Sequence, residues 1–452
     1  MEQTPTVSKP LFSSHTLRLL IVPLIVEQLL AMTVGMADTV MLTTVSEAAV
    51  SGVSLVDTIN NLIIQVLAAL ATGGAVVCSQ YLGRQDDASA RKAALQLLYT
   101  MLAFALAVSI ILLSFRRSIL GFIFGHIEAD VLSSAMVYLL LTTLSFPFLA
   151  IYNSCAALFR SMGNSRVSLV ASALMNVINI GGNAILIYGF NLGAEGAGIA
   201  TLLSRATAAL MMLMLIRSRR NPIYIDRVYP VVLDWNMIRS IFRVGVPSGV
   251  ENGIFQFGKL LVQSLITRLG TAAIAANAIL NSIAGLVIVP GSAVGLAMIT
   301  VVGQCVGAND YQQAVSYTKK LLLTAYACLI LTALPVLLLC DQVIGLFHLS
   351  AAATADALSV LPVQCIMHML LWPAAFTLPN ALRAAGDARF TMIISVCAMW
   401  VLRVGLSYVF ILGLGMGVGG VWYAMYCDWM ARIICFSIRF KRGRWKAKRV
   451  IF

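Results

Sequence analysis

The chain has 452 residues, of which 60% are hydrophobic and only 11% are charged. A soluble protein carries roughly 25% charged residues, so this composition and the mean hydropathy of +0.92 exclude a soluble enzyme or binding domain. The formal net charge of +13 raises the question of nucleic-acid binding, and the distribution of the basic residues answers it.

Lys and Arg residues concentrate on one side of the expected membrane. If the N-terminus is cytoplasmic, 24 of the 31 basic residues fall on the cytoplasmic side, and only Arg116, Arg117 and Arg268 fall on the other. The positive-inside rule then predicts a multi-pass protein of the plasma membrane with both termini in the cytoplasm. We expect the basic C-terminal tail to contact anionic lipid headgroups, not nucleic acid.

Twelve apolar stretches follow one another along the chain. They lie near residues 19–43, 51–80, 93–114, 131–157, 167–190, 195–216, 241–267, 273–303, 318–340, 357–382, 390–412 and 418–438. Each is long enough for a membrane-spanning helix, which needs about 20 apolar residues. The pattern predicts an all-α integral membrane protein with 12 transmembrane helices.

The second half of the chain repeats the first. A shift of 224 residues superposes Pro23 on Pro247 and Glu27 on Glu251, and a shift of 223 superposes Arg160 on Arg383. Because six spans separate the repeats, both halves enter the membrane in the same direction. We therefore predict two six-helix lobes related by a pseudo-two-fold axis along the membrane normal. Their expected bounds are 1–216 for the N-lobe, 217–240 for a basic cytoplasmic linker, 241–438 for the C-lobe and 439–452 for the tail.

The first span contains two acidic residues, Glu27 and Asp38. Eleven residues make about three helical turns, so the two carboxylates share one face and lie about 16 Å apart along the axis. Ionisable groups at membrane depth are costly and usually functional. We expect this face to line an aqueous cavity, with Asp38 exchanging a proton or Na⁺. The alternative is a carboxylate that only accepts hydrogen bonds from neighbouring hydroxyls.

A polar cluster interrupts the second span at Asp57, Asn60 and Asn61. Such a cluster cannot face hydrocarbon. We interpret it as part of the wall of a water-lined cavity, and helix–helix hydrogen bonding is the alternative.

Several motifs resemble one known family. They are Gly35 to Met41 (GMADTVM), the Gln-x-x-Gly-x-x-Asp ends of spans two and eight, the Arg-x-x-Gly-[Asn/Asp]-x-Arg loops after spans four and ten, and the runs 179–189 and 196–201. Together they resemble the multidrug and toxic compound extrusion (MATE) family over nearly the whole chain. The resemblance implies a transporter whose two lobes alternate access to a central cavity.

The resemblance also implies a cation-linked site in the N-lobe. The family positions correspond to Asp38, Asn179, Asn183 and Thr201. Asn183 departs from the pattern, since many members have Asp there. An amide oxygen still coordinates Na⁺ but carries no proton, so a single proton or Na⁺ per cycle at Asp38 is expected. Apart from this coupling ion, H⁺ or Na⁺, no cofactor is expected.

The C-lobe contains its own charged residues. Glu251 and Lys259 lie eight residues apart on one helical face, and Glu251 is the candidate for attracting a cationic substrate. Arg403 in the eleventh span and Asp428 in the twelfth are expected to pair, either permanently or only during part of a transport cycle. Met399 and Trp400, beside Arg403, are candidates for contacts with apolar cations.

These features favour a secondary-active, cation-coupled antiporter that exports amphipathic, often cationic organic compounds. A lipid-linked oligosaccharide flippase of the same superfamily is the alternative, although only four basic residues lie inside the predicted spans. A membrane-embedded enzyme is disfavoured, because no HExxH, Gly-x-Ser-x-Gly or Walker A motif occurs. We expect a monomer in the bilayer with small-molecule substrates and no nucleic-acid partner.

Overall fold

The computed structural model describes residues 10–43, 45–125, 128–226 and 228–451, apart from the side chains of residues 34, 36–40 and 43. The described chain is all-helical. Its α-helices are α1 (Ser14–Thr43), α2 (Glu47–Gly83), α3 (Asp87–Phe124), α4 (Ala129–Leu144), α5 (Phe146–Ser161), α6 (Ser165–Asn183), α7 (Gly193–Ile216), α8 (Trp235–Thr267), α9 (Thr271–Gly307), α10 (Tyr311–Leu338), α11 (Cys340–Gly345), α12 (Ala351–Leu370), α13 (Leu378–Ala384), α14 (Ala388–Cys397), α15 (Leu406–Tyr408) and α16 (Gly417–Lys441). Shorter segments are the π-helical η1 (Ala184–Gly189), η2 (Pro373–Thr377), η3 (Ala398–Gly405) and η4 (Val409–Gly413) and the 3₁₀ segment η5 (Arg444–Lys448).

Within the described residues, nine helices are long and apolar enough to cross a membrane. The count rises to ten if α4 and α5, which meet at an angle of 42°, form one broken span. The stretches predicted at 241–267 and 418–438 coincide with α8 and α16, which lie outside this count. Both helices carry charged residues, so composition alone does not identify them as spans.

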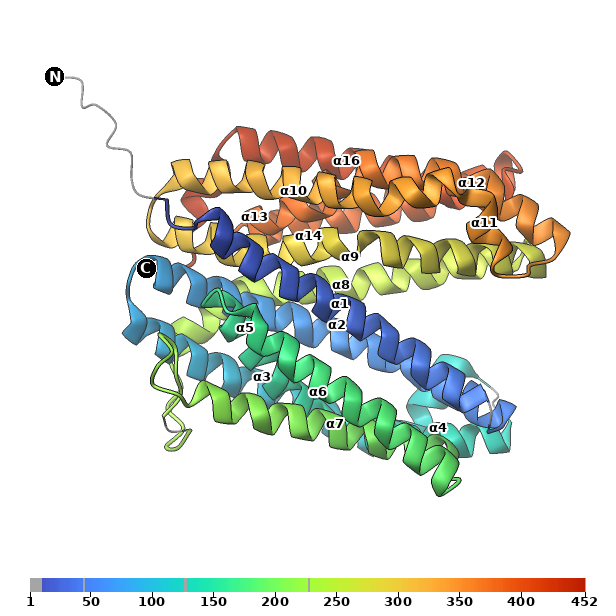
Figure 1. The fold of residues 1–452 in the computed structure, drawn as a ribbon, viewed down its shortest axis with the longest axis horizontal. Helices are drawn as coiled ribbons and strands as arrows, with labels where there is room; N and C mark the ends of the chain where they lie inside the picture. The colour runs from blue at the N-terminus through green and yellow to red at the C-terminus, as the bar shows by residue number, and fades with distance from the viewer. Residues whose placement is uncertain (1–9, 44, 126–127, 227, 452) are drawn as a thin grey trace.

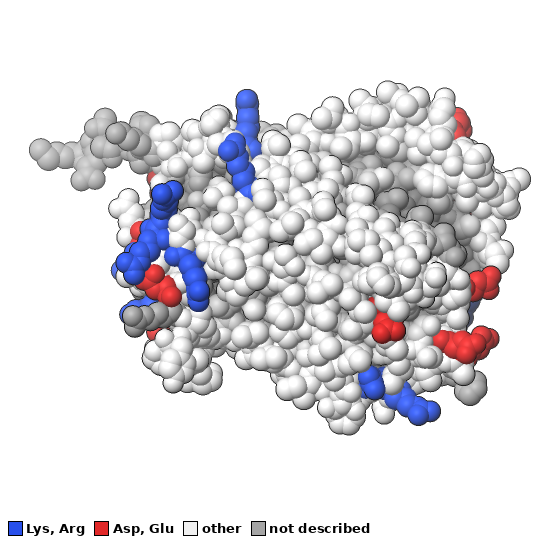
Figure 2. Space-filling model, turned by 60° about the horizontal axis from the view of Figure 1, so that its bottom comes forward, with Lys and Arg blue, Asp and Glu red and all other residues white. Residues whose placement is uncertain are grey.

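The helices run roughly side by side in an elongated bundle (Figure 1). In that view α3, α6 and α7 lie on one side, α10, α12 and α16 lie on the other, and α1, α2, α8 and α9 lie between them. Accordingly, α2 packs against both α8 and α9, while α1 packs against α6 and α9. The C-terminus and the first described residues lie at the same end. Figure 2 shows that charged side chains gather toward the ends of the molecule and leave a mostly uncharged band between them.

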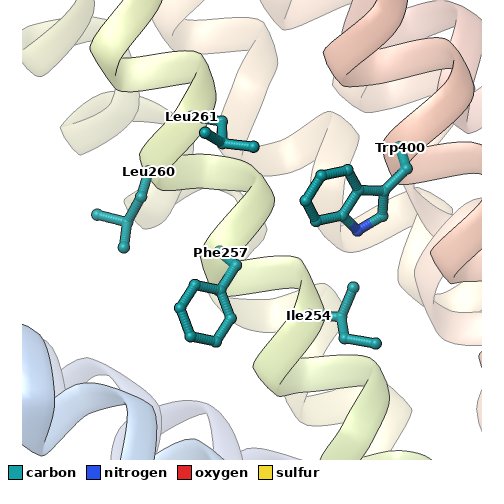
Figure 3. Close-up of a pocket in the computed structure, with 5 residues that line it drawn as sticks. All are labelled: Ile254, Phe257, Leu260, Leu261 and Trp400. Carbon is teal, nitrogen blue, oxygen red and sulfur yellow. The ribbon is translucent and has the colours of Figure 1, made fainter.

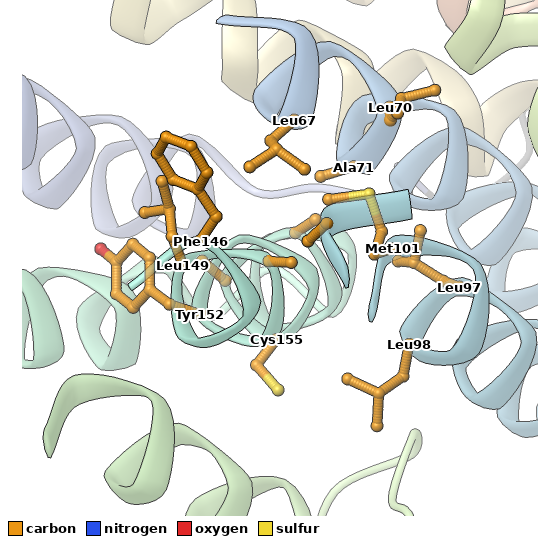
Figure 4. Close-up of a cluster of buried hydrophobic side chains, with 14 of the residues drawn as sticks. Leu67, Leu70, Ala71, Leu97, Leu98, Met101, Phe146, Leu149, Tyr152 and Cys155 are labelled. Carbon is orange, nitrogen blue, oxygen red and sulfur yellow. The ribbon is translucent and has the colours of Figure 1, made fainter. Parts of the chain in front are cut away.

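A large core cluster is formed mostly by the first half of the chain. In Figure 4, Leu67 and Ala71 of α2 face Met101 of α3 and Phe146 of α5. Leu67 and Phe146 are fully buried, and burying such a side chain stabilises the fold by about 1.5–3 kcal/mol. In the first half, α2 is thus the element against which α3, α4 and α5 pack.

The two halves cross closely at the C-terminal ends of α2 and α9. A Cβ atom at Gly83 would overlap the carbonyl oxygen of Gln304, and a Cβ atom at Gly307 would overlap that of Gln80. The side-chain amide of Gln80 donates to the carbonyl oxygen of Ala384 at 2.8 Å, and that of Gln304 donates to Ser161 at the same distance. The same contacts therefore form in both directions across the crossing of α2 and α9, which we call the seam.

The C-terminal tail packs against this crossing. Trp445, Val450 and Ile451 are buried, whereas the side chains of Lys446 and Lys448 are exposed. The backbone N–H of Val450 donates to Oε1 of Gln80 at 3.1 Å. The predicted basic tail is thus anchored to the protein by its apolar residues, while Lys446 and Lys448 stay available to solvent or headgroups.

Candidate functional site

Three polar side chains meet inside the first half, between α6 and α7. Nδ2 of Asn179 donates to Oγ1 of Thr201 at 3.3 Å, and Nδ2 of Asn183 donates to Oδ1 of Asn179 at 3.5 Å. All three side chains are buried. Helix α6 ends at Asn183 and continues as η1, and π-helical turns are frequent at functional sites.

The fourth residue of the predicted cation site, Asp38, belongs to α1, which packs against α6. Its side chain lies outside the described residues. The structure therefore brings Asn179, Asn183 and Thr201 together and leaves their predicted carboxylate partner untested. Among the described residues, no group of three or more His, Cys, Asp or Glu side chains could hold a metal ion.

The polar cluster of α2 faces α4. Oδ1 of Asp57 accepts hydrogen bonds from Nδ2 of Asn60 at 3.3 Å and from the hydroxyl of Tyr138 at 3.2 Å. Asn60 is buried, Asp57 is half-buried and Asn61 is exposed. The hydrogen bond from Tyr138 joins α4 to α2, as the alternative interpretation of this cluster expects, whereas the one from Asn60 lies within α2.

Glu27 lies in a buried polar contact between α1, α5 and α6. Nη1 of Arg160 lies 3.5 Å from its Oε1, and the hydroxyl of Ser168 donates to its Oε2 at 2.7 Å. Glu27 is 6% exposed. The carboxylate of α1 is thus held in place by one side chain from α5 and one from α6.

Glu251 has the repeat-equivalent partner. Nη2 of Arg383 lies 2.7 Å from its Oε1, and Nη1 of Arg383 donates to Oδ1 of Asn380 at 2.8 Å. Glu251 is as buried as Glu27, but its Oε2 accepts no hydrogen bond within the described part of the chain. The ion pair is thus duplicated with the repeat, while the second hydrogen bond of Glu27 is not.

A cavity of about 360 Å³ opens beside Glu251 in the second half. It is lined by Gln65, Glu251, Asn252, Phe255, Gln256, Lys259, Ser292, Phe376, Arg383 and Arg432. Its size is within the range of about 300–1,000 Å³ that is usual for small-molecule sites. The cavity contains two of the predicted substrate residues, Glu251 and Lys259.

Arg403 lies behind this cavity. Its Nη2 lies 2.9 Å from Oδ2 of Asp428, and Nε of Arg432 lies 2.6 Å from Oδ1 of the same carboxylate. All three side chains are buried. The predicted pair of Arg403 and Asp428 forms, and a second arginine that the sequence reading did not single out shares its carboxylate.

Met399 and Trp400 lie away from this cavity. Met399 is buried against Gly258, where a Cβ atom would overlap its terminal methyl group. Trp400 lines a separate apolar groove with Ile254, Phe257, Leu260 and Leu261 (Figure 3). The part of α8 that carries Trp400's neighbours therefore presents an apolar face, whereas its Glu251 and Lys259 face the polar cavity.

A family model, MatE, matches residues 23–185 and again residues 247–409. The chain belongs to the MATE family. The two matched segments begin 224 residues apart, as the superposition of Pro23 on Pro247 predicts, and end within one residue of the offset of 223 predicted there. Members of this family are transporters, so the prediction of a membrane transporter is confirmed.

Named relatives extend over the whole chain. The uncharacterized transporter YisQ of Bacillus subtilis is 26% identical over an alignment of length 455 that covers 99% of this chain and 98% of that protein. The probable multidrug resistance protein NorM of Thermotoga maritima is 26% identical over an alignment of length 460 that covers 100% of this chain and 96% of that protein. A solved structure described as the outward-facing conformation of a multidrug resistance MATE family transporter has a TM-score of 0.89, with 20% identity and 96% of each chain covered. This last likeness shows that the chain has a MATE fold.

Several residues of these sites were not singled out from the sequence. Arg160 and Arg383 occur in the MATE-like loop motif, and their repeat offset from Glu27 and Glu251 could have indicated the two ion pairs. Arg432 follows Asp428 by four residues, which is the helical spacing of an ion pair. Phe255 carried no signal, because an aromatic residue in an apolar helix is ordinary.

Proposed function

We propose that this MATE protein is a secondary-active antiporter that exports amphipathic organic compounds, often cationic, in exchange for H⁺ or Na⁺. Its twelve spans would form two six-helix lobes, with α8 and α16 as the spans that composition alone does not identify. Both termini would lie in the cytoplasm of a plasma-membrane monomer, and no catalytic activity is assigned. The similarity to probable multidrug resistance proteins supports the multidrug substrate class.

The observation that carries the coupling proposal is the buried contact of Asn179, Asn183 and Thr201 between α6 and α7. Buried amides and hydroxyls beside a helix that bears a carboxylate supply the oxygen ligands that Na⁺ requires. With Asp38 as the only acid of the set, occupancy by one small cation would change the charge of the site by one unit. A ligand shifts a conformational equilibrium only if it binds the two states unequally, and a single neutralised carboxylate provides that difference.

The Asp38→Asn variant tests this function. We expect it to insert normally and to lose ion-driven export of a fluorescent organic cation, because an amide cannot carry the proton or neutralise Na⁺. The measurement is dye efflux from proteoliposomes under a proton gradient and, separately, under a sodium gradient. Asp130→Asn, at an exposed position in the first turn of α4, makes the same acid-to-amide exchange and is expected to export at the wild-type rate. Export by Asp38→Asn at the wild-type rate under either gradient contradicts the coupling role.

A further inference from the structure

The cavity beside α8 has an unbalanced charge. Four cations surround it or lie directly behind it, namely Lys259, Arg383, Arg403 and Arg432, against the two carboxylates of Glu251 and Asp428. Arg383 is neutralised by Glu251, while Arg403 and Arg432 share Asp428. Among the described residues, Lys259 has no ion pair and no hydrogen bond from its ammonium group. Two positive charges therefore remain without a protein counter-ion.

Three of these four cations lie around one aromatic ring. The ring of Phe255 has Nζ of Lys259 at 5.4 Å, Cζ of Arg403 at 5.0 Å and Cζ of Arg432 at 5.6 Å from its centroid. At such distances the face of an aromatic ring attracts a cation. This attraction stabilises the cluster in part but does not remove its net charge. Nε of Arg403, which is 6% exposed, has no acceptor within the described part of the chain.

The surplus charge is not a product of the internal repeat. The positions that correspond to Lys259, Arg403 and Arg432 in the first half are occupied by Gly35, Ile180 and Ala209. A scaffold requirement common to both halves would have placed similar residues at both sites. Uncompensated charge at membrane depth is costly, so its presence in one half alone points to a ligand of opposite charge.

The remaining lining residues indicate what that ligand carries besides its charge. Phe255 and Phe376 provide aromatic surface, and Gln65, Asn252, Gln256 and Ser292 provide hydrogen-bonding groups. Lys259 is exposed to the cavity, so its ammonium is free to meet a ligand. Small-molecule sites combine an apolar wall with a few polar groups that orient the ligand.

We propose that this cavity binds an aromatic monocarboxylate, with the carboxylate on Lys259 and the aromatic body against Phe255 and Phe376. The inference rests on the proposed function only in identifying the bound compound as a transported substrate. It extends the substrate class of the transporter from organic cations to organic anions and zwitterions. Binding itself requires no ion gradient, so the two proposals can be tested separately.

The binding test compares dansylglycine, which carries a carboxylate, with its neutral amide dansylglycinamide. Fluorescence titration of the full-length protein in detergent measures both affinities. We expect the acid to bind at least about tenfold more tightly than the amide, the effect of one charge-assisted hydrogen bond. Equal affinities for the acid and the amide overturn the proposal, and this comparison needs no variant.

Variants then locate the site. Lys259→Gln should abolish the preference for the acid, Lys259→Arg should retain it, and Lys319→Gln, which removes an exposed lysine of α10, should leave both affinities unchanged. A preference that survives in a folded Lys259→Gln protein places the anion elsewhere and rejects this site. The Asp38→Asn variant should still bind dansylglycine, so its loss of export with binding intact would concern the coupling site alone. If the wild-type protein exports organic cations but does not prefer the acid to the amide, the cavity proposal alone is rejected.

Discussion

Glu27 and Glu251 occupy equivalent repeat positions but depend on their arginines to different degrees. Glu27 accepts a hydrogen bond from Ser168 in addition to its 3.5 Å contact with Arg160. Glu251 lies 2.7 Å from Arg383, and its second oxygen accepts no hydrogen bond in the described structure. Removing one member of a buried ion pair leaves an uncompensated charge, which costs about 3–5 kcal/mol. The cost should therefore be larger in the second half.

We predict that Arg383→Leu destabilises the protein by about 3 kcal/mol or more, and that Arg160→Leu costs less than about half of that. Thermal unfolding of the purified proteins in detergent measures the difference in stability between these repeat-equivalent variants. The double variant Glu251→Leu/Arg383→Leu should recover much of the loss, since it leaves no unpaired charge. Equal destabilisation by the two single variants contradicts the unequal dependence.

The residues of these pairs could be predicted from the sequence, but their geometry could not. Buried carboxylates and the MATE-like loop arginines stand out because charge is rare in this chain. Which arginine meets which glutamate depends on how α5 is placed relative to α1, and α13 relative to α8, and Glu27 and Arg160 are 133 residues apart. Sequence periodicity indicates which residues share one face of a helix, but not which other helix packs against that face.

At the scale of the element, the Gln-x-x-Gly-x-x-Asp motif has a structural explanation for each member. The glutamines donate across the seam, the glycines allow α2 and α9 to cross, and the aspartates cap the next helices. Oδ1 of Asp86 accepts from the N–H of Ser89 and Oδ1 of Asp310 accepts from that of Gln313. The Ser89 backbone N–H lowers the pKa of Asp86 below its ordinary value, so this cap is charged at neutral pH.

We predict that Gly83→Ala separates α2 from α9 and exposes Cys305, which is fully buried in α9. The added Cβ meets backbone, which cannot rotate away as a side chain would. Labelling by a maleimide, located by mass spectrometry, should be faster at Cys305 in this variant, and Gly307→Ala should act in the same way. Gly181→Ala is the control, because no atom lies within 4 Å of the added Cβ. If Cys305 in Gly83→Ala is labelled no faster than in Gly181→Ala, the crossing tolerates the added methyl group.

Element positions followed well from apolar stretches and the repeat, and the exceptions are informative. The fourth predicted span is broken into α4 and α5 at Ser145, and Pro147 at the start of α5 is compatible with such a break. The π-helical segments η1 to η4 were not predicted, since they change the register of a helix without changing its hydrophobic pattern. One of them, η3, carries Arg403 to the ring of Phe255.

At the scale of the whole molecule, the C-terminal tail joins both halves. The N–H of Val450 donates to Oε1 of Gln80 in α2 at 3.1 Å, and the carbonyl oxygen of Val450 accepts from the hydroxyl of Ser240 in α8 at 3.4 Å. Sequence composition predicted a lipid-contacting tail because basic residues dominate it. The buried Trp445, Val450 and Ile451 show that apolar residues between the basic ones set its position.

We predict that Val450→Asp releases the tail, because a buried carboxylate without a partner is costly. Limited trypsin digestion should then cleave the basic stretch 441–449 faster than in the wild type. Lys441→Asp, at an exposed position, introduces the same acidic residue and should leave the tail docked. Cleavage of Val450→Asp at the wild-type rate would mean that the tail's other contacts suffice to hold it.

The crossing of α2 and α9 has a consequence for the origin of the chain. Each glycine meets the backbone of the other's helix, and each glutamine reaches the matching carbonyl, so the contact is self-complementary. Two identical six-helix polypeptides could form it with each other, as in an isologous homodimer. A fusion of two such genes would have kept this contact between α2 and α9. The two halves could then diverge elsewhere, for example at Lys259, Arg403 and Arg432, without changing it.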